Sequence, residues 1–375
     1  MGMARRAGRI RVKLAALPPL EHLQSLWLEL ESRAEPSFFQ SWAWIGPWLR
    51  LICPARIARL LTVSGDGRLL GIGVLTTRRR FLGLGPRHLR LHETGDSALD
   101  DLTIEYNGLL AEKGLEREVL AATVSYLARA HPRWLTLNLP GIAIDDALLA
   151  RLRGIGLETR LRKSDTHHVD LAALRSAGSA YLPALRSANT RSTLRRTARR
   201  LAGRHGAVRL VAARGARERL AFFRDMVALH QVHWAGSGNG RGAFADPRIL
   251  RFHERLITES GEDAGAQLLR LDAGDATVGY AYNLVRRGTV YFYQAGIDYA
   301  RFGDCGSPGL LLLGEAIQWA LERGHDRFEL MAGDGRFKRS LGMARGEMAW
   351  LSLDRRGWHS RLRKAWRSLR GSAPA

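Results

Sequence analysis

Residues 289–342 decide the fold of this chain; they read TVYFYQAGIDYARFGDCGSPGLLLLGEAIQWALERGHDRFELMAGDGRFKRSLG. The segment Tyr291–Ile297 is aromatic and β-branched, which predicts a strand. The segment Leu310–Leu321 is too apolar for a surface helix and is expected to pack against a sheet. A second strand is predicted at Arg327–Met331. The stretch therefore forms a strand, a glycine-rich loop, a buried helix and another strand.

The loop that precedes the helix is a candidate anion site. Ser307 is expected at the N-cap and Pro308 at the first helical position. Gly303, Gly306 and Gly309 would let a ligand approach the backbone closely. Unpaired N–H groups at a helix N-terminus attract phosphate. Spacing alone leaves a phosphate site and an ordinary strand-to-helix turn equally open.

The sequence GLLLLGEAIQWALERG, followed by FELMAGDGRFKRSLG, resembles the BioF2-like (CelD/BcsL-type) acetyltransferase family of the GNAT superfamily, which is similar to the FemABX transferases. The resemblance is firmest between Tyr181 and Leu353. The GNAT consensus loop is Gln/Arg-x-x-Gly-x-Gly/Ala, and the match is approximate, because Arg301 precedes Gly303 by two residues and Gly306 by five. The loop YARFGDCGSPG is also longer than the consensus. The resemblance implies an α/β (α+β) fold of tandem GNAT-like domains, with mixed central sheets flanked by helices.

The resemblance also implies the chemistry. Members of the superfamily transfer an acyl group directly from acyl-CoA, and a backbone N–H on the strand before the loop polarises the carbonyl. The pantetheine arm would lie where the two strands splay apart. Acetyl-CoA or another acyl-CoA is thus the expected co-substrate. The implied cofactor-binding residues are Gln294, Ala295, Gly296, Arg301, Gly303, Gly306, Ser307 and Gly309.

Three residues in this stretch are candidates for catalysis. Asp334 follows the second strand and could act as a base or orient the nucleophile, although Asp is also common in turns. Lys338 could contact the substrate or the cofactor phosphates. Tyr293 offers a phenol, although strand tyrosines more often serve packing. Phe337 stands where family members often carry Tyr, so a phenol is absent there.

A fourth candidate, His233, ends a predicted helix beside the glycine-rich segment GSGNGRG. His230 and His233 have the i, i+3 spacing of metal ligands, but no third ligand lies nearby, so no metal site is expected. We assign His230 to an ordinary helix end. For His233, a place on the rim of the acceptor site and a cation near the negative end of the helix dipole both stay open.

The order strand, strand, helix, strand occurs twice, which predicts two domains. The first copy begins with a hairpin that turns at Gly65-Asp66-Gly67 and lacks a glycine-rich loop. We therefore expect a degenerate GNAT-like domain over residues 1–165 and an acyl-CoA-binding GNAT-like domain over residues 166–355. Residues 356–375 form a basic amphipathic tail.

The net charge of +22 favours polyanionic partners of several kinds. Arginines crowd residues 186–206, whose apolar positions from Leu194 to His205 fall on one helical face; the arginines form either a solvated face or an electropositive rim. The tail could lie on anionic lipid or dock on the protein. No apolar run approaches the ~20 residues of a membrane span. Two cysteines cannot form a disulfide framework or zinc site, which suits the cytoplasm, with peripheral contact at the inner membrane face as an option.

The leading prediction is an acyl-CoA-dependent acyltransferase, specifically an N-acetyltransferase. Its acceptor would be an amine or hydroxyl of a sugar, a polysaccharide precursor or a peptide. One alternative is a FemABX-type transferase that uses aminoacyl-tRNA, which the basic charge favours. Another is a non-catalytic module that binds anions or membranes. No GxSxG elbow or Walker loop occurs.

Overall fold

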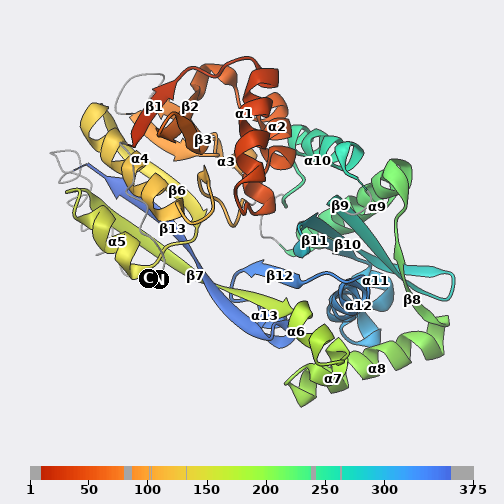
Figure 1. Cartoon of the computed structure of the whole chain (residues 1–375). Helices are drawn as coiled ribbons and strands as arrows, with labels where there is room; N and C mark the ends of the chain where they lie inside the picture. The colour runs from red at the N-terminus through yellow and green to blue at the C-terminus, as the bar shows by residue number, and fades with distance from the viewer. Residues whose placement is uncertain are drawn as a thin grey trace, which may run out of the picture. The chain divides into compact units, whose positions relative to one another are not determined.

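The computed structural model describes residues 10–79, 87–100, 102, 104–131, 133–237, 242–261 and 264–355. The predicted tail, residues 356–375, lies outside this part of the chain. The chain divides into two compact units (Figure 1). Unit 1 comprises Met1–Asp100, Ile104–Lys163 and Met348–Ala375, and unit 2 comprises Asp101–Thr103 and Ser164–Glu347.

Unit 1 is built on a mixed sheet with the strand order β1-β2-β3-β4-β6-β13. Strands β4 and β6 run parallel, and the other neighbours are antiparallel. The short strand β5 pairs with β3. The bounds are β1 (Arg11–Ala15), β2 (Ala58–Gly65), β3 (Arg68–Arg79), β4 (Arg87–Leu91), β5 (Leu110–Ala111), β6 (Trp134–Ile142) and β13 (Ala344–Asp354).

Helices flank this sheet, with α1 on β3 and α4 against β1, β2 and β3. The predicted hairpin between β2 and β3 is confirmed: Asp66 and Gly67 both have positive φ, as a tight two-residue turn requires. The helical segments are α1 (Leu20–Ser32), η1 (Phe38–Gln40), α2 (Trp42–Leu51), η2 (Ala55–Ile57), α3 (Ser97–Asp100), α4 (Glu116–Ala130) and α5 (Asp146–Arg153).

In unit 2 the strands follow the order β7-β12-β11-β10-β9-β8, which makes the unit 2 part of the sheet mixed as well. Only β11 and β12 run parallel in it. The chain crosses between the units within β7 and within β13. The strand bounds are β7 (Glu158–Asp170), β8 (Val208–Ala212), β9 (Gly265–Ala273), β10 (Ala276–Arg286), β11 (Thr289–Ile297) and β12 (Arg327–Ala332).

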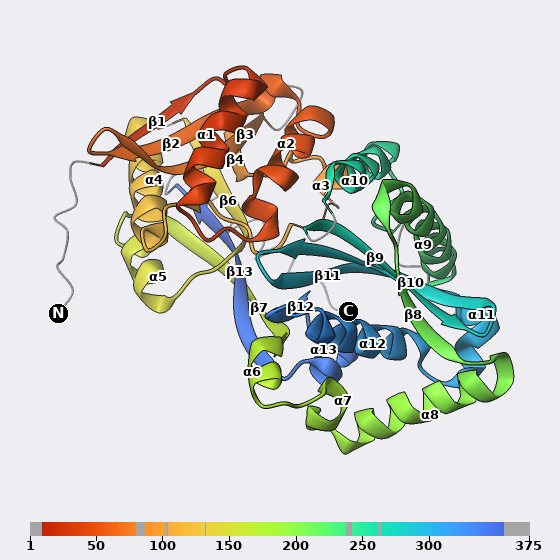
Figure 2. The same cartoon turned by 45° about the vertical axis from the view of Figure 1, so that its right-hand side comes forward.

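Helices cover both faces of the second sheet (Figure 2). Helix α9 packs on β9, β10 and β11, and α10 packs on α9; α12 lies on the opposite face with α6, α7 and α8. The helical segments are α6 (Leu171–Ser176), α7 (Tyr181–Ala184), α8 (Ala188–His205), α9 (Gly215–Ser237), α10 (Pro247–Glu259), α11 (Tyr299–Phe302), η3 (Gly303–Cys305), α12 (Pro308–Glu322) and α13 (Arg336–Leu341).

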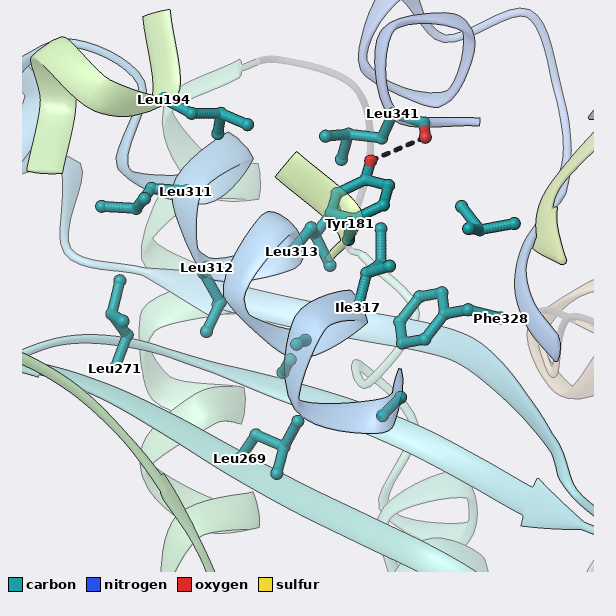
Figure 3. Close-up of a cluster of buried hydrophobic side chains, with 14 of the residues drawn as sticks. Tyr181, Leu194, Leu269, Leu271, Leu311, Leu312, Leu313, Ile317, Phe328 and Leu341 are labelled. Atoms are coloured by element: carbon teal, nitrogen blue, oxygen red, sulfur yellow. Dashed lines mark hydrogen bonds between the residues drawn. The ribbon is translucent and has the colours of Figure 1, made fainter. Parts of the chain in front are cut away.

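Helix α12 forms the centre of the unit 2 core, as its apolar sequence predicted. Leu312 and Ile317 are fully buried between the sheet and the helices α6 to α8 (Figure 3). The buried Tyr181 of α7 packs on this helix, and its hydroxyl donates to the carbonyl of Leu341 at 2.7 Å. Since α12 begins at the candidate anion loop, this core fixes where that loop lies.

The compact units divide the chain differently from the predicted domains at one place. Residues 348–354 of β13 pair with β6 of unit 1, for example Ala349 with Ile142 and Leu353 with Leu137. The contacts of unit 1 therefore include a segment that the sequence analysis grouped with residues 166–347. The status of unit 1 as a degenerate copy of unit 2 stays a prediction. In the described residues, no helix is both long enough and apolar enough to cross a bilayer.

Replacing Tyr181 with Phe is expected to destabilise unit 2 by about 1–3 kcal/mol, because the buried Leu341 carbonyl loses its donor. Chemical denaturation of both proteins measures this. A matched control is Tyr126→Phe in unit 1, where a half-buried hydroxyl contacts His131 and water can replace it. An equal loss in both variants would contradict the buried hydrogen bond.

His92 makes the stability of unit 1 dependent on pH. Its Nε2 accepts the N–H of Val74 and its Nδ1 donates to Asn107, so the buried ring is neutral. Burial lowers its pKa to about 4. The unfolded chain therefore takes up this proton first, and stability is lost as the pH falls below ~6.5.

Between pH 7 and pH 5 the free energy of unfolding should fall by about 2 kcal/mol through His92 alone. Urea titrations followed by tryptophan fluorescence measure the difference, since four tryptophans lie in α1 and α2. The variant His92→Gln should lose that part of the pH dependence. An unchanged pH dependence in the variant would show that His92 titrates normally.

Candidate functional site

The candidate site begins where β11 and β12 separate. The strands share three residue pairs, Thr289↔Arg327, Val290↔Phe328 and Tyr291↔Glu329. Beyond them β11 continues to Ile297, while β12 keeps only its other neighbour, β7, with which it pairs from Arg327↔Asp170 to Ala332↔Thr166. The splayed strands that the resemblance implied are thus present. One edge of β11 is left without its parallel neighbour from residue 292 onward.

A β-bulge lies at the start of this open edge. Tyr282 of β10 pairs with Gln294 and Asn283 pairs with Phe292, so Tyr293 is an extra residue in β11. A bulge of this kind turns the backbone N–H and C=O groups that follow it. The side chain of Tyr293 is buried against the rings of Tyr282 and His253, with ring centroids 5.5 and 5.1 Å away. The run of aromatic residues around Tyr293 predicts a strand but gives no sign of the bulge.

The end of β12 carries two more of the predicted residues. Met331 has a φ of 66°, a strained value for a residue with a side chain, and Gly333 has a φ of 122°. Lys338 of α13 donates to the carbonyl of Ala332, which ties α13 to this strand end. Asp334 is exposed. The structure therefore holds Lys338 where β11 and β12 separate, and the neighbouring Asp334 is exposed to solvent.

Phe337 lies in the gap between the strands. Its ring meets that of Phe292, the first residue of β11 beyond the pairing with β12, edge to face at 6.3 Å. An apolar contact thus replaces the hydroxyl that a tyrosine would bring to this point. Acid catalysis from residue 337 is therefore excluded.

The start of α12 agrees with the predicted anion loop in its local geometry. Ser307 is the N-cap and Pro308 occupies the first turn, as predicted. The Ser307 side chain accepts no capping hydrogen bond, so it does not satisfy the first N–H groups of the helix. The hydroxyl of Tyr299 lies near Gly309, 2.8 Å from where a Cβ would stand.

Helix α8 holds this loop from one side. The Ser307 N–H donates to the buried hydroxyl of Thr197 at 3.1 Å. Gly306 has a φ of 124°, and a Cβ there would lie 2.7 Å from the same hydroxyl. Arg204 forms an ion pair with Asp304, and this arginine lowers the pKa of the Asp304 carboxyl. One of the loop's backbone donors is therefore already in use.

The other predicted loop residues point outward. Gly303 is exposed, and nothing lies within 4 Å of the place of its Cβ. Arg301 is exposed too, with its guanidinium over the Phe302 ring at 5.2 Å. Helix α8 buries Leu194, Thr197 and Leu201, and its remaining surface is rich in exposed arginines: Arg195, Arg196, Arg199 and Arg200. This part of the molecule is strongly positive.

Gly296 has a packing role that the sequence did not reveal. A Cβ at this position would lie 2.2 Å from the backbone oxygen of Met226 in α9. Only glycine therefore allows α9 to lie so close to β11. One turn after Met226, the His230 Nδ1 lies 3.2 Å from the carbonyl oxygen of Ala295. Glycine at 296 and histidine at 230 thus dock the helix on the open strand.

The structure distinguishes two histidines of α9: His230, which the sequence analysis assigned to an ordinary helix end, contacts β11, and His233 lies at the surface. His230 is buried, its Nδ1 donates to Ala295, and burial lowers its pKa, so the ring is neutral at pH 7. His233 is exposed, and its ring lies 5.2 Å from that of Tyr299 beside the loop. Phe223, Met226 and His230 have helical spacing on one buried face, which was the signal that could have found it.

In the described residues no group of three or more His, Cys, Asp or Glu side chains could hold a metal ion. The backbone of β11 on its β12 side, the first turn of α12 and the ammonium of Lys338 come together at the candidate site. Backbone N–H groups and a helix N-terminus can together orient a carbonyl and bind an anion.

The comparison with protein families agrees with this geometry. Residues 188–339 match the model of the family described as acetyltransferase (GNAT) domain. This segment is a GNAT acetyltransferase-like domain. The match supports an acyltransferase, as the sequence predicted, and the predicted α/β fold with mixed sheets flanked by helices is confirmed. No curated protein sequence matches the chain.

Solved structures share the fold at low sequence identity. FemX is 14% identical with a TM-score of 0.56, over 90% of this chain and 96% of that one. The C-terminal domain of a putative lysylphosphatidylglycerol synthetase from Agrobacterium fabrum is 13% identical with a TM-score of 0.53, over 92% and 95%. L-PGS from Bacillus licheniformis is 14% identical with a TM-score of 0.52, over 93% and 94%. The likeness covers almost the whole chain and concerns the fold alone.

The variant Gly296→Ala is expected to destabilise the protein by about 1–3 kcal/mol, because the added methyl overlaps the Met226 carbonyl. Gly303→Ala is the matched control, since Gly303 has a φ of −61° and open space around it. Thermal unfolding of the two variants gives the comparison. Equal stability would mean that α9 does not depend on Gly296.

Proposed function

We propose that unit 2 is an acyl-CoA-dependent acyltransferase that transfers the acyl group directly to an amine or hydroxyl. The observation that carries the proposal is the open edge of β11 beside the first turn of α12. A thioester lying along this edge would meet the backbone groups that follow the bulge at Tyr293. Direct transfer needs no covalent nucleophile, which suits a site whose nearby cysteine, Cys305, is fully buried.

The residues present fit an acyl-CoA in two regions. Gln294, Ala295 and Gly296 would line the pantetheine arm, because they lie on the length of β11 that has no neighbour on the β12 side. The first-turn N–H groups of Gly309 and Leu310 would take the pyrophosphate, since Pro308 has no N–H and Ser307 donates to Thr197. The positive surface of α8 and the exposed Arg301 would attract the cofactor's phosphates.

The predicted catalytic residues have different parts in this proposal. Lys338 would act by charge, near the carbonyl oxygen or a phosphate, because its ammonium is held at the end of β12. Asp334 would meet the acceptor from the solvent side. His233 would stand on the acceptor's rim beside Tyr299. Tyr293 would act through its backbone at the bulge, since its ring is packed among buried aromatics.

The finer assignments follow from the resemblance. We place the chain in the BioF2-like branch, acting in the cytoplasm as an N-acetyltransferase on a sugar amine, a polysaccharide precursor or a peptide. Peripheral binding of the tail to anionic membrane belongs to the same proposal. The resemblance in residues 310–342 supports the branch, and the acceptor range is what that branch suggests.

A FemABX-type reaction with aminoacyl-tRNA is the second candidate. Two observations favour it: the fold is similar to that of FemX, and the exposed arginines of α8 form a basic face. Binding to such a face should weaken steeply as salt is raised, because RNA releases counterions. The use of the Ser307 N–H by Thr197 also leaves fewer donors for a pyrophosphate. A non-catalytic anion-binding module is the third candidate and would bind no acyl-CoA.

Calorimetric titration of acetyl-CoA at physiological ionic strength tests the leading proposal, with ADP as the control for general polyphosphate binding. The variant Gly309→Glu places a negative charge on the first turn of α12 and should weaken binding roughly tenfold or more. The variant Gly309→Gln has nearly the same shape without the charge and should bind more tightly than Gly309→Glu. In both variants the new Cβ would lie 2.8 Å from the hydroxyl of Tyr299, a side chain that is 45% exposed and has room to shift, and 3.4 Å from the Ile297 side chain.

Equal affinity of Gly309→Glu and Gly309→Gln for acetyl-CoA would show that the pyrophosphate does not bind at the first turn of α12. Wild-type binding no tighter than ADP would reject acyl-CoA as the donor. Titration with an aminoacyl-tRNA over a series of salt concentrations would then decide between the two remaining candidates.

A further inference from the structure

Unit 1 contains a cavity of about 720 Å³ that none of the functions above uses. It lies at one end of the sheet, where residues of five neighbouring strands converge. The register joins Arg59 of β2 to Leu75 of β3, Thr77 of β3 to Leu89 of β4, and Arg87 of β4 to Trp134 of β6. The lining from these strands is Leu14, Ala15, Arg59, Thr77, Arg87, Leu89 and Trp134.

Positive charge surrounds this cavity. Arg56, Arg59, Arg87 and Arg133 line it together with His131, and its lining contains no Asp or Glu. All four arginines are exposed. Within the described part of the chain none of them forms an ion pair, whereas Arg33 and Arg68 of the same unit share Glu112. Four guanidinium groups around one space repel each other unless an anion lies between them.

The arginines are held in place by the fold. Arg59 donates from its Nη1 to the carbonyls of Ala58 and Arg56, which keeps its guanidinium beside the η2 turn. Arg87 begins β4, and Arg133 directly precedes β6. His131 is fixed by its hydrogen bond to the Tyr126 hydroxyl. The charges are thus presented by strand ends, which lowers the entropy cost of binding.

The rest of the lining is apolar. Leu14, Leu89 and the edge of the buried Trp134 provide it. The volume lies in the range of small-molecule sites, about 300–1,000 Å³. A site of apolar wall and unpaired guanidinium groups is suited to an organic body that carries phosphate, because arginine binds phosphate oxygens through paired N–H donors.

We propose that this cavity binds a phosphate ester with an apolar body, through Arg59 and Arg87 with help from Arg56 and Arg133. The ester could be a soluble metabolite or the headgroup of an anionic lipid, since both offer the same phosphate. This site lies in unit 1 and does not depend on acyl-CoA binding in unit 2.

Calorimetric titration with phenyl phosphate and with inorganic phosphate tests the site. The wild-type protein should bind phenyl phosphate more tightly, because its ring covers the apolar wall. The double variant Arg59→Gln, Arg87→Gln should bind phenyl phosphate roughly tenfold or more weakly. The matched control is Arg50→Gln, Arg151→Gln, which removes the same charge from exposed positions of unit 1 outside the cavity. It should bind within about twofold of the wild type.

Two results would overturn the proposal. The first is an equal affinity for phenyl phosphate in the cavity variant and the control variant. The second is no binding of phenyl phosphate by the wild type, together with equal vesicle binding by the two variants. Sedimentation with phosphatidylglycerol and phosphatidylcholine vesicles separates the two sources. Loss of binding to the anionic vesicles in the cavity variant alone identifies the headgroup, and equal vesicle binding after a positive phenyl phosphate result identifies a soluble ester. The Gly309→Glu variant should keep its affinity for phenyl phosphate, whatever it does to acetyl-CoA.

Discussion

The whole of the candidate site depends on one break in hydrogen bonding, the end of the β11–β12 ladder after Tyr291 and Glu329. A parallel strand normally has a neighbour on each side, and its backbone groups are then used up. Here the pairing of β12 with β11 ends after Glu329 while its pairing with β7 continues, so β11 keeps a length of backbone with a neighbour on the β10 side alone. Its donors and acceptors are available where a helix N-terminus also points.

The break has to be stabilised by the rest of unit 2. Helix α12 is anchored by a core in which Leu312 and Ile317 are fully buried, so its first turn cannot shift. On the other face, α9 comes close to β11 at Gly296 and meets the Ala295 carbonyl through His230. Helix α13 contributes Phe337 and Lys338 near the point where β11 and β12 separate. Rigid elements therefore surround a strand edge whose backbone groups the fold leaves available.

Local patterns in the sequence were enough to predict the strand and the helix of the candidate site. The strand predicted at 291–297 is β11 at 289–297, and the helix predicted at 310–321 is α12 at 308–322. The alternation of side chains and the Ser307–Pro308 pair decide these elements within a few residues. The bulge at Tyr293 could not be predicted, because it arises from the register with β10 and leaves no mark in the alternation.

Contacts between distant segments were the other limit. Thr197 and Ser307 are 110 residues apart, and only the folded core brings them together. The sequence pattern, which both His230 and His233 end, could not show that His230 is buried against β11 while His233 is exposed. The arginines of the unit 1 cavity come from separate strands whose order the sequence does not state. The net charge follows from the composition, but the composition does not predict that these arginines cluster in the folded chain.

The hydrogen bond from Ser307 to Thr197 has a consequence for selectivity. A helix N-terminus with all its donors unpaired would attract any small anion, including chloride and inorganic phosphate from the solvent. In this protein the internal bond already satisfies one donor and holds Gly306 in its left-handed conformation without a ligand. The loop is thus held in shape by an internal contact, and a large ligand that also touched β11 would gain more from it than a simple ion would.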